Sequence, residues 1–126
     1  MKRPLVMLWR AVFLVLVLST LLSCKGVLRL FPNQLPIADA GPDQNGVGIG
    51  TTVYLDGSGS RDPDGDRLNY TWFFWNAPDA SSTVLYNYKS VSPYFEVDAT
   101  GTYVFLLVVD DGLQESKPDR VEISTP

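Results

Sequence analysis

The stretch Val53–Trp72, VYLDGSGSRDPDGDRLNYTW, determines how this chain of 126 residues folds. Apolar and polar residues alternate up to Leu55, and the alternation resumes at Leu68, with the period of a half-buried β-strand. Between them lies Asp56–Asp66, which contains three glycines, one proline and four aspartates. Such residues favour tight turns, in which Asp and Ser side chains bond their own backbone. The stretch therefore predicts a strand, an ordered polar loop and a second strand.

Further short segments on both sides of this stretch indicate strands separated by turn residues. The strongest signal is Gly101–Asp110, whose β-branched and aromatic residues favour strand over helix. The other expected strands are Pro36–Ala40, Thr52–Leu55, Leu68–Trp75, Thr83–Tyr88, Tyr94–Val97 and Leu113–Ile123. About seven strands with frequent turns predict an all-β fold, a two-sheet antiparallel β-sandwich.

The segment Leu55–Trp72 closely resembles the signature of the polycystic-kidney-disease (PKD) domain, and Pro36–Asp43 resembles the opening of that domain. The resemblance covers about Pro36–Ile123 and implies an immunoglobulin-like sandwich of PKD type. The chain departs from the family after the tryptophan, where Phe73–Asn76 replaces a common Asp-Phe-Gly-Asp-Gly-like turn. The fold is thus implied, whereas the function has to be derived from a site.

Two aromatic residues fit such a sandwich independently of the resemblance. Trp72 belongs to the third expected strand, where immunoglobulin-like domains bury a tryptophan, and Tyr103 begins the sixth, where a tyrosine corner belongs. The inter-sheet disulfide of antibody domains is absent because Cys24 is the single cysteine. Apolar packing must then stabilise the fold, with an expected core of Trp72, Tyr70, Phe74, Phe105, Leu107 and Leu55.

The N-terminus has the pattern of a secretory signal peptide, because Lys2 and Arg3 precede the apolar run Ala11–Leu22. That run is shorter than the roughly 20 apolar residues of a membrane-spanning helix. An uncleaved anchor that reaches back to Pro4 is the alternative, although Arg10 interrupts it.

The signal sequence ends in Leu21–Cys24, which resembles the processing box of bacterial lipoproteins, where cleavage precedes a cysteine that carries diacylglycerol. Lipidation would explain an unpaired Cys24 in an exported protein; the alternative is a cysteine that merely ends an ordinary signal peptide. Lys25 in place of aspartate favours the outer membrane, if the host has one. The expected organisation is a signal peptide over residues 1–23, a lipidated Cys24 and tether over 24–34, and a PKD-like domain over 35–126.

The tether contains apolar residues that either rest at the membrane interface or pack on the domain.

Cleavage would leave 103 residues (126 − 23), with 7 basic residues (10 − 3) against 14 acidic ones, a net charge of −7. Such a surface repels nucleic acid. Catalysis is not expected either, because the chain has no histidine, and its carboxylates lie in turns where little would raise their pKa values.

The aspartates of the central loop are candidate ligands for Ca²⁺, which prefers oxygen ligands. The candidates are Asp62, Asp64, Asp66 and Asp110. An immunoglobulin-like topology brings Asp110 to the same end of the sandwich, and some PKD domains bind calcium. The loop is not an EF-hand, since Arg67 and Phe73 stand where that motif has glycine and glutamate. The favoured alternative is that these side chains cap backbone N–H groups in the turns.

An apolar face is expected on the outside of the sheet. On the sixth strand, the residues that alternate with the inward row are apolar where PKD domains commonly have threonine, and the third strand adds two outward aromatics. These residues are Phe73, Trp75, Val104, Leu106 and Val108. The expected register places Phe73 beside Val104 and Thr71 beside Leu106. Either the face is an interface, or residues 27–31 or 76–82 cover it.

The sequence thus favours a membrane-anchored extracytoplasmic lipoprotein whose PKD-like domain serves noncatalytic protein–protein binding or assembly. The first alternative is carbohydrate binding, with Trp75, Phe73, Tyr86 and Tyr88 stacking on sugar rings. The second is a passive spacer from a larger surface protein, since Ser124–Pro126 ends the chain like a linker. The aliphatic residues of the outward face favour a protein partner over a glycan.

Overall fold

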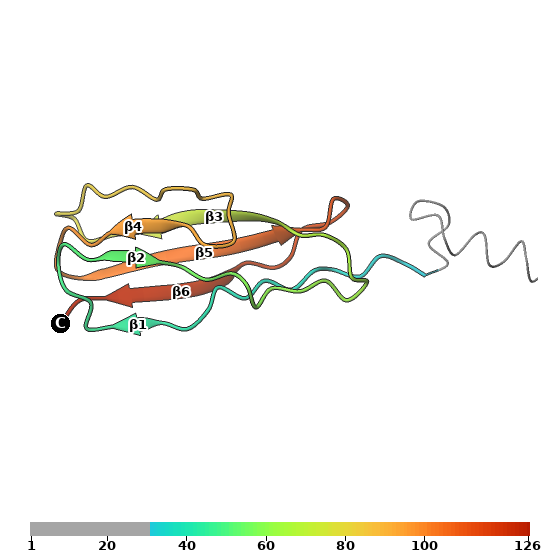
Figure 1. Ribbon diagram of the computed structural model, residues 1–126, viewed down its shortest axis with the longest axis horizontal. Coiled ribbons are helices and arrows are strands. Elements are labelled where there is room, and N and C mark those ends of the chain that lie inside the picture. Colours follow the sequence, from blue (N-terminus) through green and yellow to red (C-terminus); the bar gives the residue numbers. More distant parts are fainter. Residues whose placement is uncertain (1–30) are drawn as a thin grey trace, which may run out of the picture. The chain divides into compact units, whose positions relative to one another are not determined.

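Six β-strands in two sheets form the part of the chain that this computed structural model describes, residues 31–126 (Figure 1). The larger sheet has the strand order β1 (Gln44–Asn45), β6 (Asp119–Ser124), β5 (Thr102–Asp110) and β3 (Asn69–Asn76). The smaller sheet pairs β2 (Thr52–Tyr54) with β4 (Tyr94–Glu96). The strand pairs are antiparallel except for β1 and β6, which are parallel. The predicted all-β, two-sheet sandwich is confirmed.

A compact unit extends from Asn33 to Pro126 and so begins two residues before the predicted Leu35. Asn33 Nδ2 donates a hydrogen bond to Asp111 Oδ2 at 2.7 Å, and the backbone N–H of Gln34 donates to a carboxylate oxygen of Asp64 at 2.7 Å. These bonds attach the last tether residues to the domain. The predicted signal peptide, Cys24 and most of the tether lie outside the described residues. Residues 31–126 hold no helix long and apolar enough to cross a bilayer.

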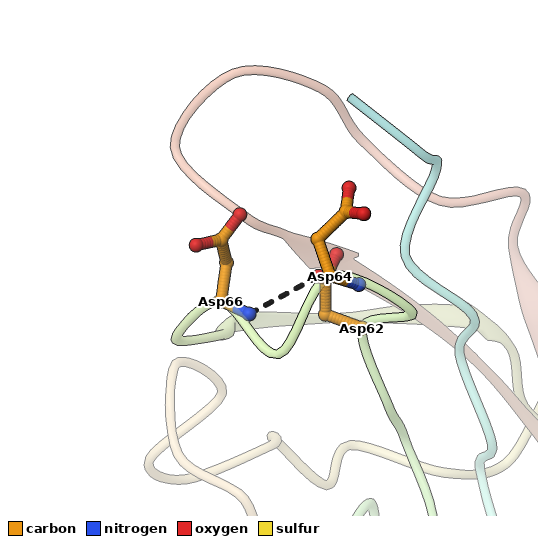
Figure 2. Close-up of side chains that lie close together, drawn as sticks. All are labelled: Asp62, Asp64 and Asp66. Atoms are coloured by element: carbon orange, nitrogen blue, oxygen red, sulfur yellow. Dashed lines mark hydrogen bonds between the residues drawn. The ribbon is translucent and has the colours of Figure 1, made fainter. Parts of the chain in front are cut away.

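The loop between β2 and β3 is ordered by its own aspartates, as the sequence predicts. Asp62 Oδ1 accepts hydrogen bonds from the backbone N–H groups of Asp64 at 2.8 Å and Asp66 at 3.1 Å (Figure 2). Earlier in the loop, Asp56 accepts from the backbone N–H of Ser58 at 2.9 Å. The hydroxyl and the N–H of Ser58 together hold the pKa of Asp56 below its ordinary value. Short-range bonds of this kind stabilise a polar turn without a core of its own.

The predicted first strand, Pro36–Ala40, is wrong, since only Ile37 forms a ladder bridge there, with Arg61. Proline has no N–H to donate to a ladder. Ala40 donates its N–H to a carboxylate oxygen of Asp119 at 2.7 Å instead of to a strand. The first strand of the structure, β1, therefore begins later, at Gln44.

The predicted strand Thr83–Tyr88 is also wrong, because it is reduced to a single bridge between Tyr86 and Tyr94. Asn87 has a φ of 56°, a left-handed conformation that ends the extended segment. The last expected strand is shorter than predicted for a related reason. Pro118 cannot donate to a ladder, and β6 begins directly after it.

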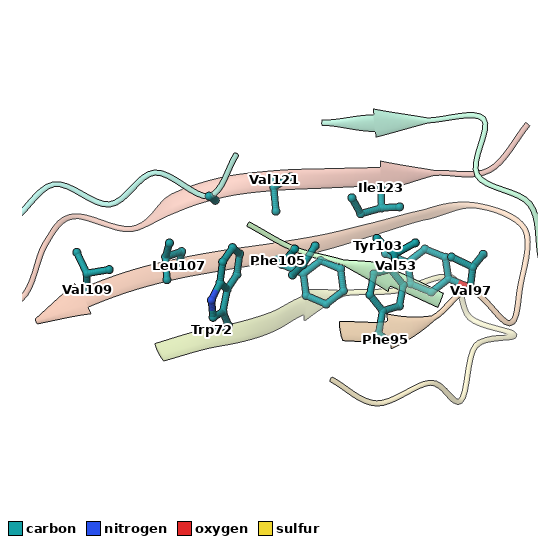
Figure 3. Close-up of a cluster of buried hydrophobic side chains, with 12 residues drawn as sticks. Val53, Trp72, Phe95, Val97, Tyr103, Phe105, Leu107, Val109, Val121 and Ile123 are labelled. Carbon is teal, nitrogen blue, oxygen red and sulfur yellow. The ribbon is translucent and has the colours of Figure 1, made fainter. Parts of the chain in front are cut away.

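The hydrophobic core lies between the two sheets and takes side chains from both (Figure 3). Phe105 of β5 is fully buried, and its ring centroid lies 4.7 Å from those of Phe74 and Phe95. Four of the predicted core residues are buried, whereas Tyr70 and Phe74 are only partly buried against the cluster. The prediction omitted several buried members: Val53, Phe95, Val97 and Ile123.

Both aromatic landmarks of the sequence are anchored by hydrogen bonds. The indole Nε1 of Trp72 donates to the backbone oxygen of Ser90 at 3.1 Å. The Tyr103 hydroxyl accepts from the N–H of Ala99 at 2.8 Å and lies 2.8 Å from the Ala99 oxygen and 3.0 Å from Asp98 Oδ1. These bonds join the start of β5 to the preceding turn, so the predicted tyrosine corner is confirmed.

Candidate binding face and acidic loop

Side chains of β5 alternate between the two faces of the larger sheet. One row points inward to the core, and the other row lies on the outer face. This outward row contains Leu106 and Val108, which pair with Phe73 and Thr71 of β3. The predicted register, Phe73 beside Val104, is therefore wrong by two residues. A shift of two residues leaves every side chain on the same face of the sheet, so the alternation pattern cannot detect it. The sequence thus predicted which face of the sheet each side chain occupies, but it did not predict which residues of β3 and β5 are paired.

Exposure on this face is concentrated on β3. Phe73 is 47% exposed and Trp75 is 70% exposed, whereas Leu106 and Val108 are half-buried. Val104 is only 5% exposed, so the expectation that it lies on an open surface is wrong. It belongs to an inner strand with partners on both sides, while β3 is at the edge of the sheet. Whether the other four residues bind a partner stays a prediction.

Polar pairs border the apolar centre of the face on β6 and β1. Arg120 and Glu122 form an ion pair beside the outward row of β5. Further along β6, the hydroxyl of Ser124 donates to Asn45 Oδ1 at 2.8 Å. An apolar centre with a polar border is the usual composition of a protein interface.

The three aspartates of the central loop form a cluster of oxygen ligands. Their carboxylates each offer one oxygen, and these atoms lie within 4.8 Å of one another. Asp62 Oδ2 is buried and has no hydrogen-bond partner within residues 31–126. This donor set fits a hard divalent cation such as Ca²⁺. Gln34, however, donates to both oxygens of Asp64, at 2.7 and 3.1 Å, and Asp62 Oδ1 caps two N–H groups. These contacts need no ion, which supports turn capping.

Asp110, the fourth candidate ligand, does not belong to this cluster. Its Oδ1 accepts from the N–H of Gly112 at 2.8 Å and thereby caps its own turn. The two acidic loops nevertheless lie at the same end of the sandwich, since Asn33 bonds Asp111 and the adjacent Gln34 bonds Asp64. The structure thus places the loops as the topology predicts, but it does not bring all four ligands together.

The aromatic residues considered for sugar binding are divided between the two sheets. Phe73 and Trp75 lie on or beside the outer face of the larger sheet, whereas Tyr86 is bridged to Tyr94 of β4. The rings of Tyr86 and Tyr94 are stacked on each other, with centroids 5.1 Å apart and planes 18° apart. A ring face covered by another ring is not free to stack on a sugar. Tyr88 lies beside β3, where its backbone oxygen accepts from the N–H of Trp72 at 2.8 Å. Tyr86 is thus the residue that does not share a platform with Phe73 and Trp75.

A groove beside the start of β3 was not predicted from the sequence. It has a volume of about 490 Å³ and is lined by Arg67, Leu68, Asn69, Tyr70, Thr71, Lys89 and Val91. Its two cations are 22 positions apart (89 − 67) and belong to different loops. No local pattern could have signalled their proximity.

Comparison with known proteins agrees with this geometry. Residues 40–124 match the family model described as K319L-like, PKD domain. The PKD domain from KIAA 1837 protein has a similar structure, with 29% identity and a TM-score of 0.60 over 75% of this chain and 90% of that one. A nucleoside hydrolase-related hypothetical protein from Saccharophagus degradans, which is associated with carbohydrate metabolism, matches with 29% identity and a TM-score of 0.64. That match covers 75% of this chain, which spans only 26% of the length of that protein.

No curated protein matches the chain. The family match nevertheless covers well over half of the sequence, and the solved PKD domain shares its two-sheet architecture. This chain therefore belongs to the K319L-like PKD domain family and folds as an immunoglobulin-like β-sandwich.

Proposed function

We propose that this protein is a membrane-anchored extracytoplasmic lipoprotein whose PKD domain binds another protein through the outer face of its larger sheet. PKD domains are generally noncatalytic and commonly mediate protein–protein contacts or act as spacers. The specific proposal adds a surface, the exposed aromatics Phe73 and Trp75 with Leu106 and Val108 beside them. The outer membrane is the expected location if the host has one.

The observation that carries this proposal is the exposure of two large aromatic side chains on one uncharged strand. Phe73 and Trp75 are 47% and 70% exposed, and Phe73 pairs with the half-buried Leu106 of β5. Single exposed apolar residues are ordinary, but neighbouring ones with a polar border indicate a contact surface. Aromatic anchors of this kind contribute much of the binding energy in interfaces.

Crosslinking in intact membranes tests the face. The wild-type chain and the double variant Phe73→Ser, Trp75→Ser should be compared with Leu113→Ser, which removes an exposed apolar side chain from a different loop. We expect crosslinked species to disappear in the double variant and to persist in the control. Crosslinks that are identical in all three chains would remove the outer face from the proposal and leave a spacer role.

The anchor is tested separately at Cys24. Cys24→Ser should block lipidation and release the protein from its mature membrane anchoring, because the thiol is the expected site of the diacylglycerol. Incorporation of labelled fatty acid and electrophoretic mobility measure the outcome. A wild-type protein that incorporates no label and migrates like the variant would contradict the anchor but leave the binding face untouched.

Carbohydrate binding is the second candidate, and the high exposure of Trp75 is the observation that favours it. An indole of this kind can stack on the face of a sugar ring. Retention on immobilised polysaccharide that is lost in Trp75→Ala and kept in Phe73→Ala would support a glycan. A protein interface predicts that both substitutions weaken crosslinking.

A further inference from the structure

The chain contains four junctions at which an asparagine or aspartate precedes a glycine. They are Asn45–Gly46, Asp56–Gly57, Asp64–Gly65 and Asp111–Gly112. At such a junction the side-chain carbonyl carbon can react with the backbone nitrogen of the glycine and close a five-membered ring. Glycine favours this reaction because it has no Cβ to obstruct the approach of its nitrogen. The four junctions can therefore be compared by what holds each glycine nitrogen.

At the three Asp–Gly junctions the glycine nitrogen is already engaged. Gly57 donates its N–H at 2.9 Å, Gly65 at 3.1 Å and Gly112 at 2.8 Å, each to an oxygen of the domain. A nitrogen that donates in this way must break its hydrogen bond before it can attack a carbonyl carbon. The folded structure thus protects these three junctions.

The Asn45–Gly46 junction, directly at the end of β1, lacks this protection. The N–H of Gly46 has no hydrogen-bond partner within residues 31–126, and both residues are exposed. Gly46 has a φ of 73°, and apart from its chain neighbours no heavy atom lies within 4 Å of the place that a Cβ would take. The nitrogen is therefore free to approach the side chain of Asn45.

The side chain of Asn45 is bound at its oxygen and free at its nitrogen. The Ser124 hydroxyl donates to Asn45 Oδ1 at 2.8 Å. Negative charge develops on this oxygen when a nucleophile attacks Cγ, so the hydroxyl stabilises the tetrahedral intermediate. The Asn45 Nδ2 group donates no hydrogen bond within the described residues, and it is the group that has to leave.

We propose that Asn45–Gly46 is a site of spontaneous modification, at which Asn45 is converted to aspartate and isoaspartate. The Gly46 nitrogen gives its proton to hydroxide and bonds to Cγ, and the Cγ–Nδ2 bond breaks as ammonia leaves with a proton from water. The cyclic imide then takes up one water molecule. Hydrolysis of its nitrogen–Cγ bond gives aspartate, and hydrolysis of its other nitrogen–carbonyl bond gives isoaspartate.

Isoaspartate at this position should detach β1 from the sheet. β1 has two residues and pairs only with β6, at the opposite edge of the larger sheet from β3 (Figure 1). Isoaspartate adds one carbon atom to the main chain at residue 45. The Val47 N–H, which bonds the Ser124 oxygen at 3.0 Å, is then displaced from its partner. The modification is thus a one-way local switch, and it involves none of the exposed residues of β3.

Peptide mapping of the aged protein tests the modification. The full-length chain in detergent micelles is kept in mildly alkaline buffer made with heavy-oxygen water and then analysed by mass spectrometry. We expect residue 45 to lose its amide, gain one heavy oxygen atom and give both products. Isoaspartate identifies the ring, because direct hydrolysis of the side chain gives aspartate alone. The asparagines that precede larger residues, Asn33, Asn69 and Asn87, should keep their amides.

The same measurement in urea shows what the fold contributes. Folding should slow isoaspartate formation at each Asp–Gly junction by roughly tenfold or more, because its N–H bond must open first. It should slow the reaction least at Asn45. The proposal would be overturned by an Asn45 that keeps its amide in the folded chain while it reacts in urea, or by a product that contains aspartate alone.

Hydrogen exchange at the Val47 amide tests the switch. The isoaspartate fraction, separated by chromatography, is compared with unmodified protein and with Asn45→Asp, which adds the charge but keeps the main chain and an acceptor for Ser124. We expect Val47 to lose its protection in the isoaspartate fraction and to keep it in Asn45→Asp. Equal protection in all three samples would overturn the switch, and a loss in both altered samples would overturn its assigned cause.

Discussion

The two faces of β5 belong to the same strand and yet have different roles. The inward row of Tyr103, Phe105, Leu107 and Val109 is completely buried. The outward row is equally apolar in sequence, but its exposure grades from a buried Val104 to half-buried Leu106 and Val108. Apolar character alone therefore does not distinguish core from surface in this domain. Core and surface are distinguished by the position of each residue relative to the neighbouring strands.

The largest expected effect is on the inward row. Phe105→Ala removes a fully buried ring that packs against Phe74 and Phe95, and it should lower the free energy of unfolding by about 3–5 kcal/mol. Urea denaturation of the purified protein measures this change, with Leu113→Ala as an exposed control. If Phe105→Ala lowered the free energy of unfolding by less than about 1 kcal/mol, the inward and outward rows of β5 would contribute equally to stability.

Two substitutions on the outer face should differ from each other. Val104→Thr introduces a hydroxyl at a site that is 5% exposed and should cost about 1–3 kcal/mol if the hydroxyl finds no partner. Phe73→Ser, at a half-exposed site, should change stability by only about 0.5 kcal/mol. A cost of about 2–4 kcal/mol for Phe73→Ser would show that the face is covered and belongs to the core.

A smaller effect is expected at the polar end of the inward row, where Tyr103 contacts Asp98. Hydrogen bonds from the Ser81 hydroxyl and then from the Ser82 N–H lower the pKa of Asp98 from 3.8 to about 2. A lowered pKa stabilises the fold above the ordinary value, and this contribution is lost as the pH falls through the folded value.

Asp98→Asn should therefore lower the Tm at neutral pH, and the difference from wild type should shrink between about pH 4 and about pH 2. Asp79→Asn is the matched control, because that carboxylate accepts no hydrogen bond within the described residues. A difference between Asp98→Asn and wild type that is constant down to pH 2 would show that the carboxylate charge does not stabilise this turn.

The smallest effect is expected from calcium. If the aspartates of the central loop only cap their own turn, the Tm in EDTA and in millimolar calcium should agree. A bound ion would instead stabilise the fold by about 2.7 kcal/mol at a hundredfold excess over Kd. A clear rise in Tm that is lost in Asp62→Asn would assign the cluster to calcium. The loop would then depend on a bound ion, and it could no longer be described as stabilised by its own hydrogen bonds alone.

The sequence predicted those features that depend on local periodicity or local turn chemistry. Trp72, Phe105 and Leu107 were assigned to the core because alternation specifies their face, and the tyrosine corner at Tyr103 follows from its place at the start of β5. The central loop was predicted as ordered because its aspartates bond within the loop itself.

The features that were missed depend on contacts between distant segments. The register of β3 and β5 could not be predicted, because a shift of two residues preserves the alternation. Asp119 bonds Ala40 and replaces a predicted strand, although the two are 79 positions apart. The groove between Arg67 and Lys89 and the burial of Val104 likewise arise only once the strands are assembled.

The opposite surroundings of two tryptophans on β3 give the protein a built-in optical reporter. Trp72 is 2% exposed and Trp75 is 70% exposed, although three positions separate them. A buried indole emits at shorter wavelength than one in water, and only the exposed indole is open to a soluble quencher. Trp9 lies in the predicted signal peptide, so cleavage would leave these two as the fluorophores. Quenching by iodide should therefore follow occupation of the outer face, while the shorter-wavelength emission follows unfolding, in one unlabelled sample.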